Sequence, residues 1–147
     1  MQTIFNKWGR ALLWVFVFST AISTAFGQGT ICQLCGMDAA KSETEFILHR
    51  KTEPPLHACC INCTRRVMKK LGDGIAEVTA LDYRTRKHVP APTAFYVIGS
   101  EHIPKGSMTP FVFAFGAQED AAKFKDRFGG EVLPFDQVLE RLEAKSK

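Results

Sequence analysis

Apolar and polar positions in the first half of the chain alternate in short runs, which glycines, prolines and polar turns separate. Alternation with a period of two predicts half-buried strands, whereas apolar residues at i and i+4, as at Val67 and Leu71, predict a helix. The pair Pro54 and Pro55 ends the first strand, and Gly72 ends the helix. The predicted elements are a strand over 45–49, a strand over 56–58, a helix over 62–71 and a strand over 75–81.

The second half repeats that order of elements. The segment from Tyr83 to Pro92 is polar, contains two prolines and is expected to be a connection without a strand. Ala121, Phe124 and Phe128 share one face of an amphipathic helix, and paired glycines end it. The predicted elements are strands over 93–98 and 111–115, a helix over 117–128, a strand over 131–133 and a helix over 135–144. The sequence therefore predicts an α+β fold of two tandem small ββαβ units with a C-terminal helix, the first over 28–82 and the second over 83–147.

The first 27 residues have the pattern of an export signal. Lys7 and Arg10 precede an apolar stretch from Ala11 to Ile22, and small residues follow at the positions that signal peptidase reads. We therefore expect residues 1–27 to be a signal peptide that is removed before Gln28, which leaves a soluble periplasmic or extracytoplasmic protein. The alternative is an uncleaved N-terminal anchor, which would be the one contact with a membrane because no second apolar stretch follows.

Net charge excludes one class of partner. The chain has 19 Lys and Arg residues and 15 Asp and Glu residues. Removal of the predicted signal takes away Lys7 and Arg10, so the basic and acidic residues of the mature chain are nearly balanced. The basic residues are scattered among acids without interleaved aromatics, so no nucleic-acid partner is expected. The local basic run at 65–70 is interpreted as the solvated face of the predicted helix.

All five cysteines lie in two short clusters, Cys32 and Cys35 in the first, and Cys59, Cys60 and Cys63 in the second. An oxidising compartment favours disulfides, but an odd number of cysteines leaves at least one thiol over. Two clusters in short loops are more typical of ligands than of cross-links that close long loops. The distribution favours a metal site, with two disulfides formed after export as the alternative.

Two ligand patterns overlap in these clusters. Cys35 and Met37 lie on either side of a glycine, and a thiolate beside a thioether is a soft donor pair that suits Cu(I). Cys32-x-x-Cys35 together with Cys60-x-x-Cys63 has instead the spacing of a structural zinc site. The two interpretations compete, because a zinc ion that takes four thiolates leaves no Cys35 for copper.

Other side chains carry less weight as ligands. His57 precedes Cys59 by two residues and could reach the same site, whereas the other three histidines are expected at the surface or at strand edges. Met68 is expected in the core. No arrangement of serine, histidine and carboxylate predicts hydrolytic chemistry, so the protein is not expected to be an enzyme.

Together with a long run in the second half, these residues resemble the NosL family. The matching positions are Cys35 to Met37, Asp82 to Thr85, Ala94 to Ser100, Met108, Phe113 to Phe115, Ala121 to Phe124, Gly129 to Val132 and Phe135. The resemblance implies two ββαβ units and an accessory protein that holds copper for nitrous oxide reductase outside the cytoplasm. It also implies Cys35 as thiolate ligand and Met37 as thioether ligand, with Met108 as a further candidate. The remaining four cysteines go beyond the single-cysteine pattern of that family.

We therefore predict an exported Cu(I)-binding metallochaperone that delivers copper to a periplasmic copper enzyme, in the manner of nitrous oxide reductase maturation. Its expected partners are that enzyme or its assembly factors, and zinc is the alternative metal. Two other functions stay open, a zinc-stabilised cysteine-rich interaction module and a thiol–disulfide oxidoreductase that uses a Cys-x-x-Cys pair. The candidate ligands are Cys35, Met37, Cys32, Cys60, Cys63, Cys59 and Met108.

Overall fold

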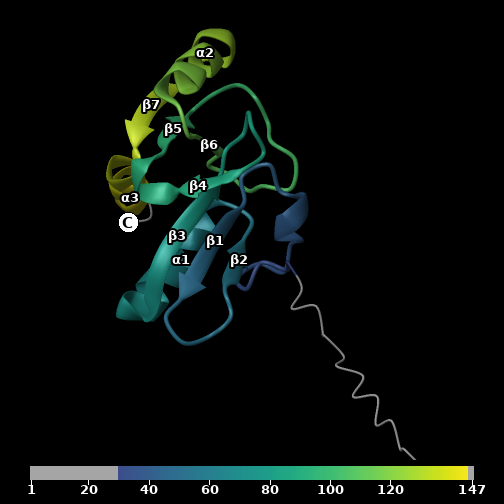
Figure 1. The fold of residues 1–147 in the computed structure, drawn as a ribbon. Helices are drawn as coiled ribbons and strands as arrows, with labels where there is room; N and C mark the ends of the chain where they lie inside the picture. Colours follow the sequence, from purple (N-terminus) through teal and green to yellow (C-terminus); the bar gives the residue numbers. More distant parts are fainter. Residues whose placement is uncertain (1–29, 146–147) are drawn as a thin grey trace, which may run out of the picture.

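The computed structural model describes residues 30–145, so the predicted signal peptide lies outside the described residues. The helices and strands are β1 (Phe46–Arg50), β2 (Leu56–Ala58), α1 (Ile61–Leu71), β3 (Ile75–Leu81), β4 (His88–Pro90), β5 (Phe95–Ile98), β6 (Val112–Phe115), α2 (Gln118–Phe128), β7 (Glu131–Pro134) and α3 (Phe135–Ala144) (Figure 1). Short 3-10 turns occur at Ala39–Lys41, Gly72–Gly74 and Ala91–Thr93. Within residues 30–145 no helix combines the length and apolar character that a membrane span requires.

Two antiparallel sheets have the same internal topology. The first has the strand order β2-β1-β3-β4 and the second has the order β6-β5-β7. In each sheet the leading strand pairs with the strand that follows it and with the strand that comes after the helix. The α+β fold with two ββαβ units and a C-terminal helix is therefore confirmed.

Strand β4 was not predicted, and here the prediction of a strand-free connection over 83–92 is wrong. His88 to Pro90 pair with β3, with Leu81 opposite His88 and Thr79 opposite Pro90. Proline has no N–H for a sheet ladder, so it is tolerated at an edge, which is where β4 lies. His88 and Pro90 are exposed, and a strand with so little buried surface has no hydrophobic alternation to reveal it.

The second sheet is buried on both faces because side chains alternate along β5. Val97 packs with Phe113 and Phe124 in a small core under α2. Tyr96 belongs to the larger core, where its ring stacks on Phe46 of β1 at 6.3 Å between centroids and meets Phe135 of α3 at 5.5 Å. One core therefore joins the first sheet, the second sheet and α3.

The connection between the units is held by one buried carboxylate. Asp82 accepts hydrogen bonds from the N–H groups of Arg84 at 2.8 Å, Thr85 at 2.9 Å and Gly116 at 2.8 Å. The N–H of Tyr83 donates to the carbonyl of Ala114 at 2.9 Å. These bonds attach the end of the first unit to β6 of the second.

Candidate metal centre

The first pair of cysteines lies in a tight loop whose ends pair as an antiparallel bridge. The N–H of Cys32 donates to the carbonyl of Met37 at 2.7 Å, and the N–H of Gly36 donates to the carbonyl of Cys32 at 2.9 Å. Gly36 has φ +74°, a backbone conformation that glycine adopts without steric cost. The Cys-x-x-Cys-Gly spacing thus forms a closed loop with a cysteine at each end of its turn.

The second cluster lies where β2 ends and α1 begins. Cys60 is the N-cap of α1, with an extended backbone at φ −161° and ψ 166°, and Cys63 is in the first helical turn. The carbonyl of Cys60 accepts the N–H of Thr64 at 3.0 Å, which is the first bond of the helix. The unpaired N–H groups at this end of a helix favour negative charge, and therefore thiolates.

The structure brings the two clusters together. The sulfur atoms of Cys32, Cys35, Cys59 and Cys63 all lie within 4.8 Å of one another. The Sγ atom of Cys59 is 3.4 Å from that of Cys35 and 3.8 Å from that of Cys63, and all five cysteines are free thiols. A tetrahedral ion with metal–sulfur bonds of about 2.3 Å places its sulfurs about 3.8 Å apart. These four side chains therefore fit a single thiolate-bound ion.

The second cluster contributes a different pair of cysteines from the pair that the zinc-like spacing predicts. That spacing pairs Cys60 with Cys63, whereas the four-sulfur group contains Cys59 and not Cys60. Cys60 is the N-cap of α1, immediately before the first helical residue, Ile61. Cys60 is nevertheless buried next to the group and hydrogen-bonds with the Cys63 thiol.

Hydrogen bonding divides the thiols into two kinds. Burial opposes ionisation of Cys32, but the N–H groups of Cys59, Cys35 and Leu34 lower its pKa to about 7. The Cys63 thiol, together with nearby N–H groups, lowers the pKa of Cys60 to about 6 despite burial. The site thus holds two cysteines that ionise near neutral pH.

The other two buried thiols resist ionisation. Burial raises the pKa of Cys59, and the negative charge that develops on Cys60 adds to the shift. The hydrogen bond with Cys60 raises the pKa of Cys63, with burial as the next cause. A soft cation at the site would replace the protons of these two thiols, because the thiolate is the form that binds metal.

Accessibility distinguishes Cys35 from the other four cysteines. Cys32, Cys59, Cys60 and Cys63 are each at most 1% exposed, whereas Cys35 is exposed. An incoming ligand from another molecule can therefore reach the group at Cys35 first.

Both candidate methionines lie near the core that contains the buried cysteines. Met37 and Met108 are half-buried and pack against that core. Met108 follows Ser107, whose Oγ is 2.7 Å from the Oγ1 of Thr44. The loop that carries Met108 is thereby attached to the segment beside the cysteine site.

Two hydroxyl groups that the sequence analysis did not single out support the site. Ser42 Oγ donates to the carbonyl of Cys59 at 2.6 Å, and Thr44 Oγ1 lies 2.9 Å from the same oxygen. Both residues are buried. They are 15 and 17 positions before Cys59, in a polar loop, so no local pattern in the sequence connects them with it.

Three of the four histidines, His57, His88 and His102, have partners outside the four-sulfur group. His57 Nδ1 is 2.8 Å from Glu45 Oε1, and His88 Nε2 is 3.3 Å from the other carboxylate oxygen of Glu45. His102 is half-buried rather than at the surface, with its Nε2 2.9 Å from the hydroxyl of Tyr83 and its ring 4.9 Å from that of Phe128. Among the described residues, the candidate centre is therefore built from sulfur alone.

Comparison with known families gives the site its context. The NosL family model matches residues 23–142, which is most of the chain. The chain belongs to the NosL family. Among solved structures it is similar to the crystal structure of the copper chaperone NosL from Shewanella denitrificans, at 25% identity and a TM-score of 0.58. The match covers 72% of this chain and 87% of that one, and no curated protein matches the sequence.

Membership of the NosL family agrees with the fold and with the resemblance noted in the sequence. The match covers 72% of this chain, which is more than either ββαβ unit alone contains, so it includes residues of both units. Family and four-cysteine group together support copper binding.

Proposed function

We propose that this NosL protein is an exported Cu(I) chaperone that delivers copper to a periplasmic enzyme of the nitrous oxide reductase type or to its assembly factors. The observation that carries the proposal is the group of four mutually close sulfurs, of which three are buried and one, Cys35, is exposed. The similar protein from Shewanella denitrificans is described as a copper chaperone. We assign no catalytic reaction to the protein.

Ligand exchange explains how such a site would load and release its cargo. Thiolates are the soft donors that Cu(I) prefers, and a thioether such as that of Met37 adds a donor that needs no deprotonation. A thiolate or thioether of the partner would bind the ion from the Cys35 side while Cys35 leaves. The ion keeps its charge throughout, so the transfer needs no oxidant or reductant.

Competitive titration of the reduced protein with Cu(I) and Zn(II), without oxygen, tests the proposal. We expect one Cu(I) per chain to displace zinc, and Cys35→Ser or Cys63→Ser to weaken Cu(I) binding by about a hundredfold or more, since each removes a thiolate ligand. Met37→Leu is expected to weaken Cu(I) but not Zn(II), because thioethers are soft ligands.

Cys60→Ser is the matched control, because it removes a buried thiol beside the group without removing one of its four sulfurs. It should retain Cu(I) binding within a few-fold. Equal losses in Cys60→Ser and Cys63→Ser would contradict the assignment of the four ligands.

A structural zinc module is a second candidate, and the sulfur–sulfur distances favour it as much as they favour copper. Such a site contributes directly to folding, because metal binding and folding are then one equilibrium. Zinc that copper cannot displace, together with unfolding on zinc removal, would replace the copper proposal by this one.

We also propose that the protein is exported and loses residues 1–27. The intact mass of the protein recovered from the periplasm should correspond to a chain that begins at Gln28. A mass that includes Met1, with the protein in the membrane fraction, would indicate an uncleaved anchor instead.

A further inference from the structure

A groove of about 260 Å³ lies directly beside the cysteine loop. It is formed by that loop, by β1 and β2, and by the side of α1 that carries Arg66 and Lys70. Its lining combines apolar residues with cations. The apolar residues are Leu34, Leu56, Val67 and Leu71, the cations are Arg50, Arg66 and Lys70, and Gln33 is the remaining member.

The cations of this groove are largely unneutralised. No acidic residue lines it. Arg50 forms an ion pair with Glu53, but neither Arg66 nor Lys70 takes part in a salt bridge within residues 30–145. Positions 66 and 70 are separated by one helical turn, so they form one continuous basic edge.

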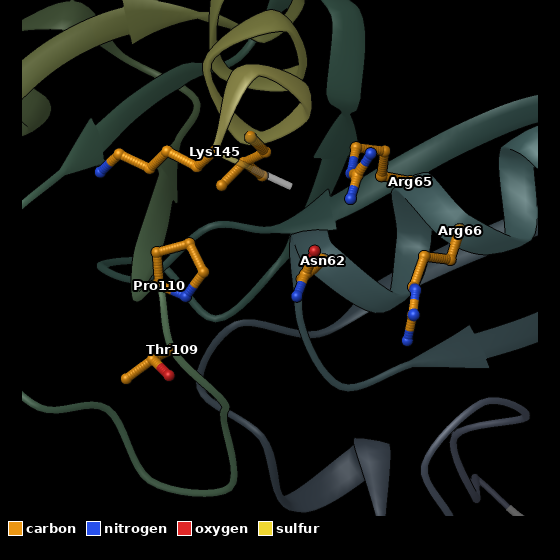
Figure 2. Close-up of a pocket in the computed structure, with 7 residues that line it drawn as sticks. Asn62, Arg65, Arg66, Thr109, Pro110 and Lys145 are labelled. Carbon is orange, nitrogen blue, oxygen red and sulfur yellow. The ribbon is translucent and has the colours of Figure 1, made fainter. Parts of the chain in front are cut away.

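The neighbouring side of α1, about 100° around the helix, differs in this respect. Arg65 and Lys69 line a hollow that also contains Asp136, Glu140 and Glu143 of α3, and Arg65 forms an ion pair with Glu143 at 3.7 Å. In Figure 2, Arg65 and Arg66 extend from α1 in different directions, with Arg65 toward α3. The basic run at 65–70 therefore has one side that shares a hollow with acidic residues of α3 and one side whose groove contains no acidic residue.

Leu34 connects the groove with the cysteines. It is 43% exposed and lies between Cys32 and Cys35 in the loop. Single exposed apolar side chains are common on protein surfaces, so Leu34 matters here because it lines the groove and not because of its exposure alone. A molecule seated in the groove would touch Leu34 and hence be next to Cys35.

We infer that this groove is the docking site of the protein that exchanges copper with the cysteine group. The inference rests on the proposed function and adds the chemistry of the partner. That partner presents an apolar side chain flanked by carboxylates. The partner's apolar side chain packs on the apolar residues that line the groove, and its carboxylates form ion pairs with Arg66 and Lys70.

Fluorescence anisotropy with a labelled peptide that carries one leucine between pairs of glutamates tests this inference. The Cu(I)-loaded protein should bind it, and should bind the same peptide with glutamine in place of glutamate much more weakly. The double change Arg66→Glu with Lys70→Glu should weaken binding by about tenfold or more and reduce or reverse the loss of binding with added salt, because attraction becomes repulsion. Leu34→Ser should weaken binding with its salt dependence intact.

The matched control is Lys87→Glu with Lys125→Glu, which changes the net charge equally at exposed positions outside the groove. Equal weakening by both double variants would show non-specific attraction and overturn the inference. Binding to phosphatidylglycerol vesicles but not to the peptide, or self-association lost in the Arg66/Lys70 variant, would assign the groove to a membrane or to a second copy instead. Cu(I) binding should be unchanged in the Arg66/Lys70 variant, so failure of docking is distinguished from failure of the copper site, which the cysteine variants report.

Discussion

At the scale of single residues, the cysteine loop depends on one backbone conformation. Gly36 has φ +74°, and a Cβ atom added there would meet no other atom within 4 Å. The requirement for glycine is therefore one of backbone angle and not of space. Because Gly36 lies next to Cys35, any change in its angle moves the exposed ligand.

Gly36→Ala tests this requirement. We expect it to lower the free energy of unfolding by about 1–2 kcal/mol, the cost of a left-handed conformation for a residue with a Cβ. It should also weaken Cu(I) binding, since the loop would relax and move Cys35. Chemical unfolding and Cu(I) competition measure the two effects.

Gly74→Ala is the comparison, because Gly74 has no positive φ and an added Cβ meets nothing within 4 Å. It should be neutral or slightly stabilising. If both alanine variants retain full stability and copper affinity, the loop does not depend on Gly36.

At the scale of elements, the site is made where β2 passes into α1 and is held by the segment before β1. Thr44 Oγ1 lies 2.9 Å from the carbonyl of Cys59 and 2.7 Å from Ser107 Oγ, so one buried hydroxyl connects the cysteine junction with the loop that carries Met108. The peptide that positions Cys59 is therefore fixed by elements distant in the sequence.

Thr44→Val removes this hydroxyl while keeping the shape of the side chain. It should cost about 1 kcal/mol of stability, because Ser107 loses its hydroxyl partner and the Cys59 carbonyl keeps only the hydrogen bond from Ser42. Urea unfolding of the metal-free, reduced protein measures the loss.

Thr79→Val is the same substitution at a hydroxyl that is buried without a hydrogen-bond partner. There it removes an unsatisfied polar group and should be neutral or stabilising. A loss in Thr79→Val as large as that in Thr44→Val would show that the Thr44 hydrogen bonds contribute nothing specific.

The elements also show how far the sequence predicts the structure. The strands over 56–58 and 75–81 and the helix over 135–144 are confirmed at both ends, since each has a clear periodic pattern with glycine or proline nearby. Strand β4 was missed because its pairing to β3 is a tertiary contact of a nearly unburied segment. Similarly, the spacing of the cysteines indicated a metal site, but which of the adjacent Cys59 and Cys60 joins the group depends on the backbone between β2 and α1, which the spacing does not specify.

At the scale of the whole molecule, Tyr96 is the residue at which the two units meet. It is fully buried, stacks between Phe46 of the first sheet and Phe135 of α3, and donates its hydroxyl to the carbonyl of Ala91 at 2.8 Å. Burial raises the pKa of Tyr96 well above that of an exposed tyrosine. The folded protein therefore retains the phenol proton at pH values where the unfolded chain releases it.

This difference predicts how stability depends on alkaline pH. Above about pH 10 the unfolded chain binds fewer protons than the folded protein, so the free energy of unfolding must fall as pH rises. Tyr96→Phe should cost about 1 kcal/mol near neutral pH, where a hydrogen bond is lost, but should show a smaller fall above pH 10. Urea unfolding of both proteins from pH 7 to 11 measures the two slopes, and thiol ionisation contributes equally to each. Parallel slopes would mean that Tyr96 can ionise within the fold, and that the packing between the two units is looser than its ring contacts indicate.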